Sequence, residues 1–250
     1  MVLFVSDMHF GLGSRAEERA VEAALVACLR SFEARTSHLY LVGDVFERYI
    51  EYRRLVPKGF VRFMALLAAW TDRGIGVTYL VGNHDPWHQD YFATELGIRV
   101  VRGSVLEQAD GVLCHVQHGD GLGHSGRGFR AIRPLLRNRA IVSLYRSLLP
   151  ADIGLGLAHS VSTRLRRRRH DPNVAQDMRR VAEHTLEASG AQVVVLGHSH
   201  HAELRAWPAG AYMNTGCWRD DGSFGLLHND RVRLMRWQAG KALLVAEHHL

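Results

Sequence analysis

Seven side chains that can bind a divalent cation lie in five short motifs spread along the chain. The motifs are Asp7-Met8-His9, Gly43-Asp44-Val45-Phe46-Glu47, Gly82-Asn83-His84-Asp85, His118-Gly119-Asp120 and Gly197-His198-Ser199-His200. Their oxygen and imidazole donors are Asp7, His9, Asp44, Asn83, His118, His198 and His200. This number and mixture of donors suits two divalent ions about 3.5–4 Å apart that share one carboxylate and keep open positions for water. The motifs therefore predict a dinuclear metal site.

The types of donor also restrict the metal. Imidazole and carboxylate ligands suit Mn, Fe, Zn or Co, and we expect manganese first, with iron or zinc as the alternatives. The three cysteines, Cys28, Cys114 and Cys217, are far apart in the sequence and form no CxxC motif. This spacing disfavours a structural zinc site and a disulfide framework, and it is typical of a reducing compartment.

Each motif follows a segment that has the character of a buried strand. We expect these strands at 2–5, 39–42, 77–81, 112–117 and 193–196, with helices at 15–35 and 59–72. Short apolar runs rich in β-branched and aromatic residues are typical of strands covered on both faces, and ligands gather at the carboxyl ends of such strands. Because residues i and i+2 point the same way on an extended backbone, we expect Asp7 and His9 to converge, and His198 and His200 likewise.

The last fifth of the chain has a different pattern. Short segments alternate apolar and polar residues, which is typical of half-buried antiparallel strands. We expect strands at 203–207, 211–214, 224–228, 232–237 and 242–246. Asn229-Asp230 is a plausible hairpin turn between two of them. A mostly parallel half followed by an antiparallel half predicts two packed sheets with helices outside, in one α/β domain over 1–250.

An inserted segment at 124–170 interrupts this pattern. It carries eleven arginines against a single acid, Asp152. Apolar residues at three- and four-residue steps predict two or three amphipathic basic helices that form a cap within the main domain. The run Arg164–Arg169 has two interpretations, a phosphate-binding surface or a solvated helical face.

Composition sets the wider limits. The formal net charge of +6 favours anionic partners. Only residues 1–6 precede the first motif, and the most apolar stretch, 63–70, is far shorter than the roughly 18 residues of a membrane span. We expect a cytoplasmic protein, and a peripheral contact with the anionic inner face of the cell membrane stays open.

In this order, the motifs resemble those of the calcineurin-like metallophosphoesterase superfamily, whose pattern is D-x-H, G-D-x-x-[DE], G-N-H-[DE], H and G-H-x-H. The resemblance extends from Asp7 to about Trp218. It implies a four-layer α/β-β/α sandwich and a phosphoric ester or anhydride hydrolase with two divalent ions. One ion would be held by Asp7, His9, Asp44 and His200, and the other by Asp44, Asn83, His118 and His198.

The resemblance also implies catalytic roles. Asp44 would bridge the two ions, which together would activate water for in-line attack on phosphorus. His84 would neutralise charge on the phosphoryl group or protonate the leaving group. Glu47 matches the position that orients this histidine, and the alternative for Glu47 is a solvated acid at a helix start.

Within the superfamily, the sequence is similar to the UDP-2,3-diacylglucosamine hydrolases of lipid A synthesis. Three features carry this similarity: Phe46-Glu47, the arginine-rich insertion with Phe129-Arg130, and the segment 214–218. The similarity implies cleavage of a pyrophosphate to UMP and a lipid-linked sugar 1-phosphate, with Asn83 and Arg130 contacting the substrate. One departure is His84, where those hydrolases commonly have arginine.

Two other functions stay open. A metallophosphoesterase acting on nucleotides, nucleic acid or other phospholipids could use Arg164–Arg169 to bind phosphates. No interleaved aromatic residues for base stacking accompany that run, so nucleic acid is disfavoured as the substrate. A non-catalytic scaffold with the same fold is also disfavoured, because all seven donors are present together with His84. Nothing in the sequence determines the oligomeric state.

Overall fold

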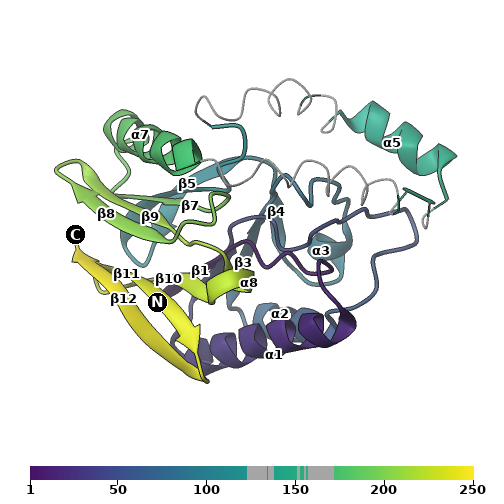
Figure 1. Ribbon diagram of the computed structural model, residues 1–250, viewed down its shortest axis with the longest axis horizontal. Helices are drawn as coiled ribbons and strands as arrows, with labels where there is room; N and C mark the ends of the chain where they lie inside the picture. Colours follow the sequence, from purple (N-terminus) through teal and green to yellow (C-terminus); the bar gives the residue numbers. More distant parts are fainter. Residues whose placement is uncertain (123–133, 135–137, 151–152, 155, 157–171) are drawn as a thin grey trace.

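The computed structural model describes residues 1–122, 134, 138–150, 153–154, 156 and 172–250, and these build two stacked β-sheets with helices on their outer faces (Figure 1). The larger sheet has seven strands in the order β12-β11-β10-β1-β2-β3-β4, and the smaller has five in the order β5-β6-β7-β9-β8. The parallel strands β1, β2, β3 and β4 are neighbours, whereas β10, β11 and β12 extend the same sheet in antiparallel fashion.

The strands of the larger sheet are β1 (Val2–Val5), β2 (His38–Leu41), β3 (Gly76–Leu80), β4 (Arg99–Val101), β10 (Ser223–His228), β11 (Arg231–Gln238) and β12 (Lys241–His249). Those of the smaller sheet are β5 (Ser104–Ala109), β6 (Val112–Gln117), β7 (Val193–Leu196), β8 (Glu203–Trp207) and β9 (Gly210–Asn214). The helices are α1 (Arg15–Phe32), which continues into a 3-10 turn (Glu33–Arg35), α2 (Val61–Asp72), α3 (Tyr91–Thr94), α5 (Arg139–Leu148), α7 (Pro172–Ser189) and α8 (Trp218–Asp221).

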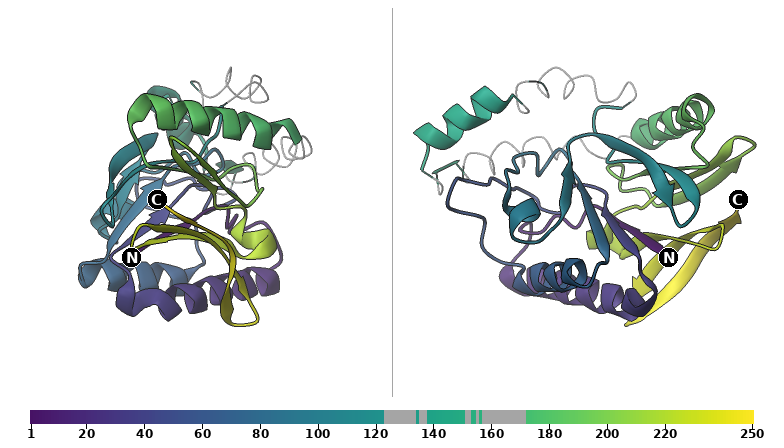
Figure 2. Two further views of the ribbon diagram at one scale, coloured as in Figure 1. Left: turned by 90° about the vertical axis from the view of Figure 1, so that its left-hand side faces the viewer. Right: turned by 180° about the vertical axis from the view of Figure 1, so that it is seen from behind.

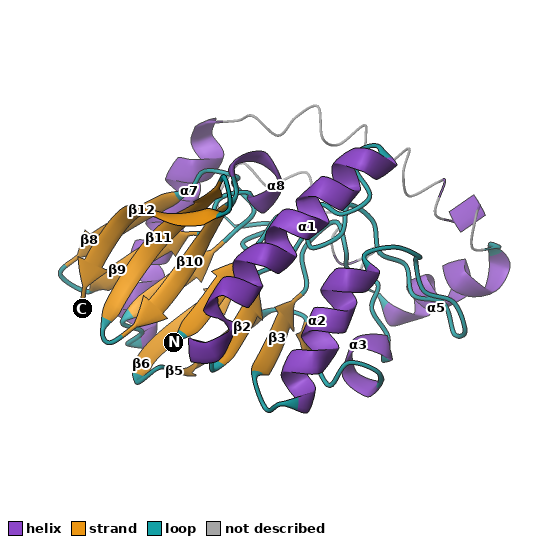
Figure 3. Cartoon of the chain, turned by 90° about the horizontal axis from the view of Figure 1, so that it is seen from below, coloured by secondary structure: helices purple, strands orange, loops and turns teal. Residues whose placement is uncertain are grey.

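The layers follow from alternation along the buried strands. In β1, Leu3 and Val5 belong to the core beneath α1 and α2, whereas Val2 and Phe4 belong to the core between the sheets. The central strand β7 of the smaller sheet divides in the same way between the intersheet core and the core beneath α7. Figures 2 and 3 show α1 and α2 covering one outer face and α7 the other. The four-layer α/β-β/α sandwich is confirmed.

The two long helices of the outer layer begin for different reasons. α1 has a local capping box, in which the Ser14 and Glu17 side chains each pair with the other residue's backbone. α2 has no side-chain cap of its own, and its N-cap residue, Phe60, has a left-handed φ of 53°. Glu22 of α1 supplies the cap instead, because its Oε1 accepts hydrogen bonds from the backbone N–H groups of Arg62 and Phe63 at 2.9 and 3.1 Å.

The structure contains elements that the sequence-based prediction did not include, among them the short helices α3 and α8. The strands β4 and β5 and the helix α7 were not expected. β4 has three residues, and β5 is largely exposed at an edge of the smaller sheet, so neither carries a long apolar pattern. The two sheets also do not divide between the two halves of the chain, because β10 pairs with β1.

The predicted cap falls largely outside the described residues. Of the segment 124–170, the structure describes α5, which the sequence pattern anticipated, and a few positions near it. Among the helices of the described residues, none is both long and apolar enough to cross a bilayer.

The cap on α2 gives a testable prediction. Replacing Glu22 with Ala leaves two backbone N–H groups without their carboxylate acceptor, and a hydrogen bond to a charged group contributes about 2 kcal/mol. We expect the free energy of unfolding to fall by about that amount in a urea titration. Glu187→Ala, the same change at an exposed position of α7, serves as the control. Equal stabilities of the two variants would contradict the capping role.

Candidate metal centre

The five motifs meet at one edge where the two sheets lie over each other. Asp7, Asp44 and Asn83 follow β1, β2 and β3 of the larger sheet, and His118 and the pair His198/His200 follow β6 and β7 of the smaller sheet. Both sheets therefore contribute donors. The sequence order of these strands did not indicate that two sheets would share the site.

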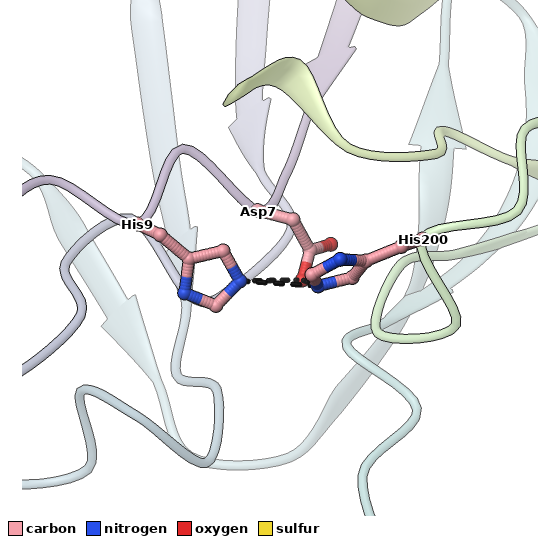
Figure 4. Close-up of side chains that lie close together, drawn as sticks. All are labelled: Asp7, His9 and His200. Carbon is pink, nitrogen blue, oxygen red and sulfur yellow. Dashed lines mark hydrogen bonds and ion pairs between the residues drawn. The ribbon is translucent and has the colours of Figure 1, made fainter. Parts of the chain in front are cut away.

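One group of donors contains Asp7, His9 and His200 (Figure 4). Oδ1 of Asp7 lies 3.2 Å from Nε2 of His200 and 3.5 Å from Nε2 of His9. The two imidazole nitrogens are themselves 3.1 Å apart. One ligand atom from each of the three residues lies within 4.8 Å of the others, which is close enough for a single cation to bind all three.

Two further groups contain Asp44. Asp44, His118 and His198 offer ligand atoms within 4.8 Å of one another, and so do Asp44, His9 and His84. Nε2 of His118 is 3.3 Å from Oδ2 of Asp44 and 3.3 Å from Oδ1 of Asn83. Asp44 thus belongs to two groups, as a carboxylate shared by two ions must. All seven predicted donors come together, and their role as ligands stays a prediction.

The convergence has a different local cause from the one expected. Asp7 and His9 have φ angles of 55° and 46°, and His198 and His200 have 65° and 57°. These residues are therefore left-handed, and the expectation of an extended backbone through each pair was wrong. Asp44 is also left-handed, with φ 51°. Non-glycine residues rarely adopt this conformation, and its concentration at one edge is typical of a functional site.

Two glycines make room for the donors. A Cβ on Gly82 would lie 2.2 Å from Oδ1 of Asp44, and a Cβ on Gly43 would lie 2.4 Å from Nδ1 of His118. Gly43 also has φ 86°, a conformation that favours glycine. The tight approach of the loops after β2, β3 and β6 thus requires residues without side chains at these positions.

The electrostatics of the site suit cations. Asp7 and Asp44 are fully buried. Burial would raise the pKa of Asp7, but His200 and His9 hold it well below its usual value. The pKa of Asp44 is lowered in the same way, by His118 and His84 against the effect of burial. Burial would lower the pKa of His118, whereas Asp44 raises it to about 10. The negative charge of the two aspartates, which favours protons on these imidazoles, equally favours divalent cations in place of those protons. The donors therefore fit the predicted pair of metal ions.

Glu47 contacts two histidines. Its Oε2 lies 3.0 Å from Nδ1 of His9 and 3.4 Å from Nδ1 of His84. His84 is further held by its backbone N–H, which donates to Oδ1 of Asp44 at 2.8 Å. A carboxylate on the far nitrogen of a ligand imidazole fixes the orientation of the ring and raises its basicity. The prediction that Glu47 orients His84 did not include this contact with His9.

Asp85 is a residue whose role the sequence did not reveal, although it belongs to a quoted motif. Its Oδ2 accepts from the backbone N–H of Val45 at 2.8 Å and from the Tyr79 hydroxyl at 2.5 Å, and its Oδ1 accepts from the N–H of Gly82 at 2.9 Å. The buried carboxylate therefore joins the loops that carry Asp44 and Asn83.

Other contacts support the donors from outside. The Ser6 hydroxyl donates to Oδ2 of Asp7 at 2.5 Å, and Oδ2 of Asp220 lies 3.5 Å from Nδ1 of His200. Ser6 and Asp220 gave no signal in the sequence, because single polar residues next to motifs are common. Arg130, predicted to contact the substrate, lies outside the described residues.

Similarity to known proteins identifies the class of this protein. A family model described as calcineurin-like phosphoesterase matches residues 1–202. The chain belongs to this family of metal-dependent hydrolases, and its clustered aspartates and histidines are suited to divalent metal binding.

Relatives in sequence carry a more particular name. A UDP-2,3-diacylglucosamine hydrolase from Porphyromonas gingivalis is 34% identical over 167 residues, which span 66% of this chain and 63% of that protein. Another from Sodalis glossinidius is 27% identical over 226 residues, 88% of this chain and 91% of that protein. The first alignment therefore spans just under two thirds of the relative's length, and the second spans most of both chains.

Solved structures share the fold. Vacuolar protein sorting 29 from Cryptosporidium parvum aligns with a TM-score of 0.50 and 14% identity, over 100% of this chain and 97% of that one. An archaeal phosphodiesterase aligns with a TM-score of 0.50 and 10% identity, over 94% and 98%. At these identities the likeness concerns the fold alone.

The close approach at Gly82 yields a prediction for the site. In Gly82→Ala the new methyl group would displace the Asp44 carboxylate, so we expect Mn²⁺ affinity to fall by at least about tenfold in isothermal titration calorimetry. Gly103→Ala is the matched control, because nothing lies within 4 Å of a Cβ there. Unchanged Mn²⁺ affinity in Gly82→Ala would show that metal binding does not depend on the space that Gly82 leaves for the Asp44 carboxylate.

Proposed function

We propose that this protein hydrolyses the pyrophosphate of UDP-2,3-diacylglucosamine, releasing UMP and a lipid-linked sugar 1-phosphate. The observation that carries the proposal is the pair of fully buried carboxylates, Asp7 and Asp44, each surrounded by imidazoles at the shared edge of the two sheets. The names of the sequence relatives from Porphyromonas gingivalis and Sodalis glossinidius support this substrate.

We assign the two ions to the donors in two sets. Asp7, His9, Asp44 and His200 would hold one ion, and Asp44, Asn83, His118 and His198 the other. When bound, the ions supply Lewis-acid chemistry and make water acidic enough to provide a nucleophile near neutral pH. Manganese is the proposed metal, because the donor set is imidazole, carboxylate and amide without sulfur.

The residues of the chain itself have distinct tasks in this reaction. The side chain of His84 is 6% exposed and directs Nε2 toward Asp44, with 4.0 Å between Nε2 and Oδ2. From there the imidazole would face the phosphoryl group, neutralise charge or deliver a proton to the leaving oxygen. Glu47 would hold the ring of His84 in this orientation, and Asn83 would also contact the substrate.

The inserted segment would bind the lipid part of the substrate. α5 exposes Ile141, Leu144 and Leu148 by 40%, 58% and 68%. The opposite side of the helix is anchored near the site, since Nη2 of Arg146 donates to the carbonyl of Trp87 at 2.8 Å. We propose that residues 124–170 form a cap whose apolar face shelters the acyl chains of the substrate. The arginines of this segment, Arg130 among them, would bind the diphosphate. The cap would also contact the inner face of the cell membrane from the cytoplasm.

A substrate assay tests the reaction. We expect the Mn²⁺-loaded protein to release UMP from UDP-2,3-diacylglucosamine, and chelation of the metal to abolish turnover. Asp44→Asn should lower kcat/KM by at least about 100-fold, because the shared carboxylate would be lost. Asp230→Asn, the same change at an exposed turn between β10 and β11, is the control.

The alternatives give different results in the same assay. Turnover of bis-nitrophenyl phosphate alone would keep the metal hydrolase and exclude this substrate, and nucleotides and other phospholipids would then be examined. Bound metal with no turnover of either compound would favour a non-catalytic scaffold.

The cap gives a separate prediction. Leu144→Ser should lower the kcat/KM for the diacylated substrate, because it removes apolar surface from α5, and it should leave hydrolysis of bis-nitrophenyl phosphate unchanged. The matched control is Leu243→Ser, which alters a leucine of β12 that is 45% exposed. An equal loss on both substrates in Leu144→Ser would mean that α5 supports the metal site rather than the lipid.

A further inference from the structure

A buried ion pair lies against the backbone of the segment that carries Asp7 and His9. Arg219, in α8, donates from Nη2 to Oε1 of Glu18 at 2.7 Å and from Nη1 to the carbonyl oxygen of His9 at 3.1 Å. Both side chains of the pair are only 11% exposed. The guanidinium group therefore joins the backbone of His9 to the first turn of α1.

Glu18 fixes the chain that follows His9. Its Oε2 accepts from the N–H of Gly11 at 2.8 Å, and its Oε1 accepts from the N–H of Gly13 at 2.6 Å. Hydrogen bonds to a charged acceptor are roughly twice as strong as those between neutral groups. A Cβ on Gly13 would lie 2.5 Å from Nη2 of Arg219, so this glycine leaves the space that the guanidinium fills.

The backbone of the same short helix holds the other end of the segment. The N–H of Arg219 donates to the carbonyl oxygen of Asp7 at 3.3 Å, and Sγ of Cys217 donates to the same oxygen at 3.2 Å. Residues 217–219 thus contact the carbonyls of both Asp7 and His9, the two residues there with left-handed φ angles. Such a conformation persists only where surrounding contacts over-determine it.

We propose that Arg219 and Glu18 are positioning residues for the ion assigned to Asp7, His9 and His200. The proposal rests on the ligand assignment of the proposed function. The pair acts on the loop after β1, whereas Asn83, His118 and His198 lie on the loops after β3, β6 and β7. Its loss should therefore weaken one ion of the two selectively, because only one set of ligands would relax.

Binding of Mn²⁺ tests this without any substrate. Metal-free protein is titrated with Mn²⁺ by calorimetry, and free Mn²⁺ is followed by electron paramagnetic resonance. We expect wild-type protein to bind two ions, and Arg219→Met to bind one of them about tenfold more weakly with the other unchanged, the lower end of the loss seen for outer-shell partners. Arg219→Lys should lie between them, because a single ammonium group cannot span Glu18 and the His9 carbonyl.

Two comparisons separate positioning from general stability. Arg233→Met removes a partly buried arginine that pairs with Glu247 between β11 and β12, remote from the loop after β1, and should leave both Mn²⁺ affinities unchanged. Glu18→Gln should lower the affinity for the same ion as Arg219→Met does. If the methionine variant folds poorly, Glu18→Gln and Arg219→Lys test the positioning role in its place. Circular dichroism melts of the metal-free proteins report stability independently.

The outcomes are distinct. Arg219 variants that melt at a lower temperature but bind both ions as tightly as wild type would overturn the positioning role. Equal weakening of both ions would overturn its selectivity. Wild-type protein that binds two ions but does not cleave UDP-2,3-diacylglucosamine would end the proposed function and leave this inference standing. Wild-type protein that binds no metal would overturn both.

Discussion

Asp7 and Asp44 are both inaccessible to solvent at the edge where the two sheets meet, and this burial constrains the surrounding structure. A buried carboxylate is strongly destabilising unless opposite charges and hydrogen-bond donors surround it. Here the donors are backbone N–H groups, such as that of His198 to Asp7 at 3.0 Å, together with a shell of imidazoles. The same negative charge that requires this shell makes the site suited to divalent cations.

The second constraint is conformational. Donors from five loops can meet only if several residues take left-handed backbone angles, and such angles need support from neighbouring chain. The loops after β1 and β2 support each other, since the N–H groups of Asp7 and His9 donate to the carbonyls of Gly43 and Asp44, each at 3.1 Å. The Asp85 carboxylate does the same for the loops after β2 and β3. The tightly packed core beneath each strand makes this arrangement rigid.

In the proposed function, the hydrolytic chemistry belongs to the strand ends and the substrate specificity belongs to the inserted segment. The candidate metal centre lies at the ends of buried strands, and side chains such as Glu47 and Asp220 hold its imidazoles from outside. Within the inserted segment, the described helix α5 combines exposed leucines with an arginine that contacts the loop after β3. In general, a scaffold that fixes the reacting groups can keep one reaction while a segment outside it changes the substrate.

Local sequence was sufficient for the layers and for the identity of the donors. A strand such as Val193–Leu196, apolar throughout, can only be buried on both faces, so its pattern predicts a central position between two layers. Motifs directly after such strands predict donors at a common edge. The weakly patterned strand β5, exposed at the edge of its sheet, escaped prediction. The helix α2 was predicted, but its cap was not, because Glu22 of another helix supplies it.

What the sequence alone determined is the set of donors and the family, since residue types and their spacing state which atoms can bind metal. What only the tertiary structure decided is how those atoms meet. The left-handed angles at Asp7 and His9, the bridge made by Asp85, and the pairing of Arg219 with Glu18 all depend on residues far apart in the chain. Their contacts arise when the sheets pack, and no local pattern encodes a hydrogen bond between positions 201 residues apart.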